Sequence, residues 1–325
     1  MTRSWFRCTI LAAAVFSALF IVSACGKKDA PSKLTIAVIP KGTTHSYWKS
    51  VHAGAINAGN DLGVTIKYDG PMQESDIAGQ QALVEGFIAD GVDGIVLAPT
   101  SDAALLRAVQ DATAKKIPVV IIDSALKGEA GKDYVSYVST NNKQGGVMAG
   151  DAMTRILNGN GKIVMLRYAE YSASTNEREA GFLESIHKTP GLTMLVDNRY
   201  AGATEAAAQT EAENLLDQLR QADGVFCSNE SATLGMLHVL EQNNLTGKVH
   251  FVGFDATDRE VDAMKKGEIE ALVSQNPVNM GYLGVKTCVD HIQGKSVDPV
   301  IDSGVKLITP ANLNDPEIQK FLAGG

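Results

Sequence analysis

Short β-branched runs alternate with amphipathic stretches from Leu34 onward, and this alternation constrains the fold of the 325-residue chain more than any other feature. It is typical of parallel β-sheets whose strands are joined by crossover helices. The candidate strands are nearly all apolar, as expected where helices cover both faces of a sheet. They are 34–39, 64–68, 94–98 and 118–122 in the first half, and 162–166, 193–196, 225–227, 249–253, 270–273 and 304–308 in the second. The length fits two such sheets.

Helices are predicted between these strands wherever apolar residues recur with helical spacing. They are 47–62, 77–89, 103–115, 142–157 and 277–293. The N-caps expected for the first three are Ser46, Asp76, and Ser101 or Asp102. Gly146 and Gly150 would let helix 142–157 approach a neighbouring helix closely.

The composition is that of a globular protein, with 45% hydrophobic and 20% charged residues. Residues 1–24 hold two arginines and no acidic residue, so the remainder carries 27 basic residues (29 less two) against 37 acidic ones. A net charge of that sign argues against nucleic acid as a partner, because its recognition depends on basic patches.

The N-terminus is typical of an exported lipoprotein. Arg3 and Arg7 precede a nearly unbroken apolar run over 10–22, and the run closes with small residues directly before Cys25. We therefore expect residues 1–24 to be a cleaved signal peptide, Cys25 to be lipidated, and residues 25–33 to be a linker to the membrane. An uncleaved membrane anchor is the alternative, and either reading places the remainder outside the cytoplasm.

Two cysteines remain after Cys8 of the signal and Cys25 are set aside. Cys227 lies in a strand-like run and Cys288 in a helix-like run. An exported compartment permits a disulfide, but buried free thiols are common in such runs, and we expect two free thiols.

Polar residues directly follow several apolar runs of the predicted sheets. Ligands of open parallel sheets bind beyond the carboxyl ends of the strands, where this chain has Asp123, Asn229, Asp255 and Gln275. A flexible loop after the first strand leads into His45, Tyr47 and Trp48. Taken singly, an aspartate can be a turn former, Trp48 a core residue and His45 a solvated one. Together, acids, amides and an aromatic face suit the hydroxyls and C–H face of a sugar.

Catalytic motifs are absent from the sequence. The Gly-Asn-Gly-Lys run at 159–162 lacks the spacing and hydroxyl of a P-loop, and no zinc motif or nucleophile elbow occurs. Asp123 and Asp255 could form a glycosidase carboxylate pair, so an enzyme remains a rival hypothesis. We expect no cofactor and no metal.

Several motifs resemble those of the type I periplasmic sugar-binding proteins, nearest to the ribose-binding group, over 34–308. They are Ile117-Pro118-Val119-Val120-Ile121-Ile122-Asp123, Asn141-Asn142 with Gly145-Gly146 and Ala149-Gly150-Asp151, Asn176-Glu177-Arg178-Glu179-Ala180-Gly181-Phe182, Val225-Phe226-Cys227-Ser228-Asn229-Glu230, and Val252-Gly253-Phe254-Asp255. Each is weak alone, and their order and spacing carry the resemblance.

The resemblance implies two Rossmann-like, doubly wound α/β lobes with sugar bound between them and hinge-like closure. It implies three chain crossings, which we place near Ser139, Asn276 and Val305. The expected N-terminal lobe is 34–139 plus 276–304, and the expected C-terminal lobe is 140–275 plus 305–325.

The resemblance also assigns ligand-binding positions. His45, Tyr47 and Trp48 fall where the family has an Asn and two aromatics, and Asp123, Asn229, Asp255 and Gln275 match its sugar-binding acids and amides, with Asn142 a looser match. Two positions depart from the ribose binders, which carry Arg where this chain has Ser124 and Asn176. Arg178 stands at a second arginine whose role the motif does not assign. Losing two bidentate donors changes which hydroxyls are satisfied, so ribose itself is doubtful.

These observations predict a lipid-anchored, monomeric receptor that captures a monosaccharide or related polyol and delivers it, closed, to an ABC permease. A sensor that presents its closed form to a membrane receptor or histidine kinase is the alternative. A cytoplasmic repressor of the same fold is disfavoured, because an export signal and no DNA-binding helices precede Leu34.

Overall fold

The computed structural model describes residues 33–324. The predicted signal peptide and Cys25 lie outside the described residues. Within 33–324, no helix combines the length and the apolar character needed to cross a membrane.

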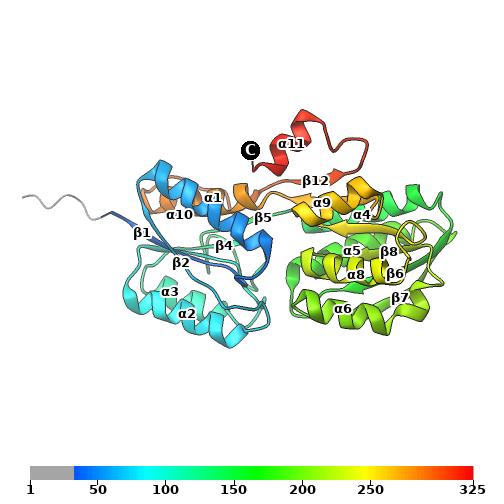
Figure 1. Ribbon diagram of the computed structural model, residues 1–325. Helices are drawn as coiled ribbons and strands as arrows, with labels where there is room; N and C mark the ends of the chain where they lie inside the picture. Colours follow the sequence, from blue (N-terminus) through cyan, green and yellow to red (C-terminus); the bar gives the residue numbers. More distant parts are fainter. Residues whose placement is uncertain (1–32, 325) are drawn as a thin grey trace, which may run out of the picture. The chain divides into compact units, whose positions relative to one another are not determined.

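The first lobe is built on a six-stranded, wholly parallel sheet in the order β11-β5-β4-β3-β1-β2 (Figure 1). Its strands are β1 (Thr35–Ile39), β2 (Thr65–Tyr68), β3 (Gly94–Leu97), β4 (Val119–Ile122), β5 (Ser136–Ser139) and β11 (Val300–Asp302). Its helices are α1 (Ser46–Leu62), α2 (Ile77–Asp90), α3 (Leu106–Ala114) and α10 (Pro277–Ile292).

Alternate strand residues of this sheet enter two different cores. Ile36 and Val38 pack with α1 and α10 on one face, while Ala37 and Ile39 pack with α2 and α3 on the other. Figure 1 shows these two helix layers above and below the sheet. Both faces are therefore covered, which explains the almost unbroken apolar strands.

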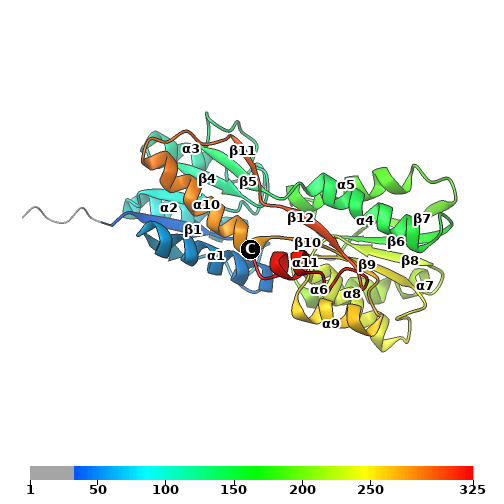
Figure 2. The same cartoon turned by 90° about the horizontal axis from the view of Figure 1, so that it is seen from above.

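The second lobe repeats this plan in the order β12-β10-β9-β8-β6-β7, with only β12 antiparallel (Figure 2). Its strands are β6 (Gly161–Arg167), β7 (Leu192–Tyr200), β8 (Gly224–Cys227), β9 (His250–Phe254), β10 (Ala271–Gln275) and β12 (Val305–Ile308). Its helices are α4 (Asn142–Ile156), α5 (Ala173–Ile186), α6 (Glu205–Asn214), α7 (Leu216–Leu219), α8 (Glu230–Gln242), α9 (Asp258–Lys266) and α11 (Pro316–Leu322). Helices α4 and α5 cover one face, and α6, α8, α9 and α11 the other.

The chain passes between the two sheets three times: after β5, after β10 and after β11. Thr140 and Gln275, which flank two of these crossings, share a hydrogen bond from Oγ1 to Oε1 of 2.9 Å. The expected fold of two doubly wound α/β lobes joined by three crossings is confirmed.

Close helix pairs in both lobes depend on glycine. A Cβ on Gly146 of α4 would lie 1.9 Å from the Arg178 carbonyl oxygen of α5, and a Cβ on Gly54 of α1 would lie 1.9 Å from the Val278 carbonyl oxygen of α10. The close packing predicted for helix 142–157 is thus confirmed, and it sets the position of Arg178.

The structure corrects the expected start of two helices. The N-cap of α1 is His45, and Ser46 is its first residue. Helix α3 begins only at Leu106, because Ser101 Oγ accepts from the amides of Ala103 and Ala104 and holds a turn before it. Asp76 caps α2 as predicted, accepting from Gly79 N at 2.8 Å.

Strands β5 and β11 were not predicted, because one is half serine and the other has three residues. Cys227 and Cys288 are buried free thiols, as predicted.

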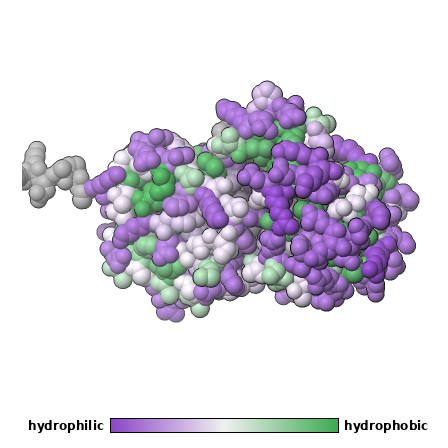
Figure 3. All heavy atoms as spheres, in the orientation of Figure 1, coloured by the Kyte–Doolittle hydropathy of each residue, from purple (hydrophilic) through white to green (hydrophobic). Residues whose placement is uncertain are grey.

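The face of the second lobe seen in Figure 3 is mostly hydrophilic, with hydrophobic residues only in scattered groups.

Candidate functional site

A narrow cavity of about 30 Å³ lies between the carboxyl ends of the two sheets, and both lobes contribute to its lining. Eight of the predicted site residues line it: His45, Tyr47, Trp48, Asp123, Arg178, Asn229, Asp255 and Gln275. Seven further lining residues were not predicted: Lys41, Glu74, Tyr168, Ser172, Ser174, Thr175 and Glu230. This volume is far below the roughly 300 to 1,000 Å³ of ligand pockets, so the lining side chains must move apart before a ligand of that size can enter.

The two strand-end aspartates share an unusual backbone. Asp123 directly follows β4 with a φ of 64°, and Asp255 directly follows β9 with a φ of 75°. Left-handed backbone is unfavourable for residues other than glycine, and such strain is concentrated at functional sites. In each lobe, a left-handed backbone conformation directly after a strand thus directs one carboxylate into the cavity.

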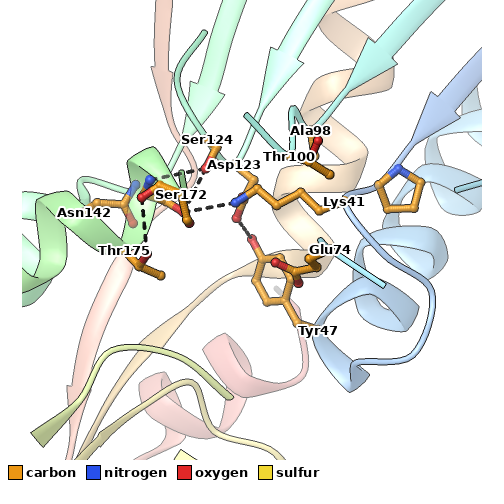
Figure 4. Close-up of polar contacts among 12 residues, drawn as sticks. Lys41, Tyr47, Glu74, Ala98, Thr100, Asp123, Ser124, Asn142, Ser172 and Thr175 are labelled. Carbon is orange, nitrogen blue, oxygen red and sulfur yellow. Dashed lines mark hydrogen bonds and ion pairs between the residues drawn. The ribbon is translucent and has the colours of Figure 1, made fainter. Parts of the chain in front are cut away.

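Asp123 is held by a lysine and a tyrosine of its own lobe. Lys41 Nζ lies 2.7 Å from Asp123 Oδ2, and the Tyr47 hydroxyl donates to Oδ1 at 3.0 Å. Figure 4 shows these three side chains converging. Lys41 also donates to Ser174 Oγ of the second lobe at 3.2 Å. A buried cation therefore connects the strand-end acid of one lobe to the other lobe.

Glu74 is the centre of a second buried network. Its Oε1 accepts from Trp48 Nε1 at 2.7 Å and lies 3.0 Å from His45 Nδ1, while Oε2 accepts from the Tyr168 hydroxyl of the other lobe at 2.8 Å. Burial alone would raise the pKa of Glu74, but the hydrogen bond and charge of His45, with Lys41 and Trp48, lower it to about 2.

The same pair raises the pKa of His45. Burial favours the neutral imidazole, but the hydrogen bond and charge of Glu74, with the charges of Glu230 and Asp255, outweigh it and raise the pKa to about 9. At neutral pH the pair is an imidazolium beside a carboxylate, so His45 is an ionised wall residue rather than a solvated loop residue.

The second lobe supplies the opposite wall. Arg178 Nε donates to Asn142 Oδ1 at 2.8 Å, and its guanidinium lies 4.0 Å from the centroid of the Phe254 ring. Gln275 Nε2 donates to Asp255 Oδ1 at 2.8 Å. Burial raises the pKa of Asp255, while Arg178 and this hydrogen bond lower it in part. The planar guanidinium is thus held against an aromatic face of its own lobe.

Three predicted residues do not line the cavity. Asn142 is buried and orients Arg178. Ser124 Oγ shares a 2.9 Å hydrogen bond with Ser174 Oγ of the other lobe. Asn176 Nδ2 donates to the Glu170 carbonyl at 2.9 Å, at the protein surface. The structure therefore places Ser124 and Asn142 behind the wall and Asn176 away from it.

Trp48 has features of both predicted alternatives, a core residue and a residue of the binding face. Its side chain is only 2% exposed and belongs to the core with α10, yet it also lines the cavity. The Tyr47 ring lies against it edge-on, with centroids 4.9 Å apart.

The rule that located Asp123 and Asp255 could have located two of the missed residues. Lys41 comes two residues after β1, and Tyr168 directly follows β6. Glu74 lies in the loop between β2 and α2, and no periodicity of the sequence marks it. Over 33–324, no group of three or more His, Cys, Asp or Glu side chains is arranged to hold a metal ion.

Comparisons with known proteins identify the family of this chain. The sequence profile of the periplasmic binding protein domain matches residues 36–296. The ribose import binding protein RbsB of Haemophilus influenzae is 29% identical over 303 residues, covering 93% of this chain and 98% of the relative. RbsB of Bacillus subtilis is 30% identical over 237 residues, covering 73% and 75%.

Solved structures show the same two-lobed fold. A carbohydrate transporter solute-binding protein from Agrobacterium radiobacter, in complex with D-arabinose, is 34% identical with a TM-score of 0.85, covering 90% of this chain and 100% of that one. An ABC transporter solute-binding protein from Agrobacterium vitis with bound D-fucose is 34% identical with a TM-score of 0.84, covering 88% and 98%. The chain belongs to the type I periplasmic sugar-binding proteins.

Proposed function

We propose that this protein captures a neutral monosaccharide or related polyol between its lobes and presents the closed form to an ABC permease. The observation that carries the proposal is the balance of charge around the cavity. Lys41 is paired with Asp123, and His45 with Glu74. An ionic ligand that displaced a partner from either pair would leave the other partner buried and unpaired, which is costly. The other charged wall residues have neutral partners: Arg178 donates to Asn142 and to the Ser228 carbonyl, and Asp255 and Glu230 accept from Gln275 and from backbone amides.

The remaining wall chemistry suits hydroxyl groups. Asn229, Gln275 and the serine hydroxyls can donate or accept, while the rings of Tyr47, Trp48 and Tyr168 offer aromatic surface for C–H groups. Similar proteins carry D-arabinose or D-fucose, and curated relatives are named for ribose.

Ribose is not the favoured ligand for this chain. Where ribose binders place Arg after the strand-end aspartate, this chain has Ser124, and the cation beside that aspartate is Lys41, two residues after β1. An ammonium is a point charge rather than a planar fork, so it satisfies a different pattern of hydroxyls.

A thermal-shift screen over pentoses, hexoses and polyols, with uronic acids and amino sugars as charged controls, tests the ligand class. A sugar that binds only the native state raises the melting temperature. Stabilisation by a neutral sugar without turnover supports the proposal. Stabilisation by charged sugars alone would contradict the ligand class, and product formation would contradict a receptor.

The lipid anchor on Cys25 is a separate part of the proposal, and it rests on the sequence pattern before that residue. In producing bacteria, an alkyne-labelled fatty acid should enter the wild-type protein, which should sediment with membranes. Cys25→Ala should abolish both. A Cys25→Ala protein that still carries label would contradict lipidation at this residue.

A further inference from the structure

The first turn of α1 has no cap from its own lobe. The side chain of its N-cap, His45, makes no capping hydrogen bond, and no acidic residue lies in the first turn. The first amides of a helix need acceptors, and its N-terminal end attracts negative charge. This turn also carries Tyr47 and Trp48 of the cavity wall.

The missing cap comes from the other lobe. Ser46 N donates to Glu230 Oε1 and Tyr47 N donates to Glu230 Oε2, each at 2.9 Å. Glu230 is the first residue of α8 in the second lobe and is only 5% exposed. One buried carboxylate thus lies at the N-terminal ends of two helices from different lobes, where both helix dipoles favour it.

Glu230 also connects to the sugar-facing wall of its own lobe. Its backbone amide donates to Asp255 Oδ2 at 2.9 Å, and the preceding residue is Asn229. Both carboxylate oxygens of Glu230 accept hydrogen bonds from the first turn of α1. Glu230 therefore links the aromatic wall of the first lobe to the wall of the second lobe that holds Asn229 and Asp255.

We propose that Glu230 is a positioning residue that stabilises the closed arrangement of the lobes by capping α1 across the cleft. This inference rests on the proposed function of a receptor that closes over a sugar. Separation of the lobes by a few ångströms breaks both bonds, because amide hydrogen bonds weaken beyond about 3.2 Å. The cap therefore exists only in the closed state.

A residue that biases closure has a different signature from one that contacts the sugar. Apparent affinity is the intrinsic affinity scaled by the population of the competent state. Loss of the cap lowers that population whether or not sugar is present. The apparent affinity therefore falls by the same factor for every sugar. Loss of a direct contact changes the order of preference among sugars.

The first experiment compares wild type, Glu230→Ala and Glu230→Gln by calorimetric titration with D-arabinose, D-fucose and D-ribose. We expect Glu230→Ala to weaken each sugar that binds by the same factor, about five- to thirtyfold, and Glu230→Gln to weaken them less. Asp76→Ala is the matched control, because Asp76 caps α2 within one lobe. Its sugar affinity should not change.

The second experiment removes one donor and leaves Glu230 in place. Ser46 is exposed and is the first residue of α1, where proline is tolerated, and His45 has the extended backbone that a following proline requires, with a φ of −70° and a ψ of 147°. Ser46→Pro deletes one capping N–H, while Ser46→Ala keeps it. We expect a common loss of about two- to tenfold for proline only.

Unchanged affinity in both Glu230→Ala and Ser46→Pro would overturn the inference, as would factors that differ from sugar to sugar. If Glu230→Ala does not fold, the comparison of Ser46→Pro with Ser46→Ala still tests the inference. A wild type that binds no sugar would overturn the proposed function, and this inference with it.

Discussion

Lys41 Nζ lies 2.7 Å from Asp123 Oδ2, and both side chains are 4% exposed. The two residues are far apart in sequence and meet because β1 and β4 flank β3 in a parallel sheet. The carboxyl ends of both strands therefore lie at one edge of the sheet, and the two side chains meet there.

Lys41→Met removes the ammonium and leaves Asp123 buried without its cation. We expect the free energy of unfolding to fall by about 3 to 5 kcal/mol, the usual range for breaking a buried pair, and sugar affinity to fall at least tenfold. Urea denaturation and calorimetry measure the two effects. Lys67→Met is the control, because the Lys67–Asp90 pair is exposed and should contribute less than about 1 kcal/mol. Equal losses in the two variants would contradict a special role for Lys41.

Asp255→Ala removes the acceptor of Gln275 and of the Glu230 amide. Asp255 also lines the cavity, and a hydrogen bond from a sugar hydroxyl to its carboxylate would contribute about 1.5 to 3 kcal/mol. Sugar affinity should therefore fall at least tenfold while circular dichroism shows a folded protein. A folded variant that binds sugar like the wild type would place Asp255 outside the binding site.

Trp48 offers an optical signal for binding. The chain has two tryptophans, and Trp5→Phe leaves Trp48 as the single one. In this structure its indole is 2% exposed and donates to Glu74. We expect a shift of its emission to shorter wavelength when sugar closes the lobes, because an open cleft admits water to this wall. Tight calorimetric binding with constant emission would show that Trp48 is a core residue in both states.

The His45 and Glu74 pair predicts a pH dependence of stability. The pKa of His45 is raised from 6.5 to about 9, so its contribution is complete below pH 6.5 and is lost as the pH rises through 9. The pKa of Glu74 is lowered from 4.5 to about 2, so its contribution is complete above pH 4.5 and is lost as the pH falls through 2. The pair therefore stabilises most between about pH 4.5 and 6.5.

His45→Gln should remove this pH dependence while keeping a donor for Glu74. Urea denaturation at pH 6 and at pH 9.5 should show wild type losing more stability than the variant, by up to about 3 kcal/mol, because each tenfold change in proton affinity corresponds to about 1.4 kcal/mol. Parallel losses in both proteins would mean that His45 is not the group that titrates.

The strand-end rule predicted the positions of Asp123 and Asp255 well, because carboxyl ends of parallel strands must meet at one edge. The family resemblance, which added Asn142 and Ser124, did not distinguish wall residues from the residues that support them. The side chains of Asn142 and Ser124 differ from those of the lining residues only in their orientation. Neighbouring side chains determine this orientation.

The amino-acid sequence by itself determined the two α/β sheets, ten of the twelve strands described over 33–324 and the family, since these depend on local periodicity and on motifs in order. Only the tertiary structure decided which charges are paired. Lys41 with Asp123, His45 with Glu74, and Glu230 with the first turn of α1 are contacts between segments far apart in sequence or in different lobes. Such contacts depend on how strands and lobes are placed side by side, and no spacing of residues along the chain encodes that directly.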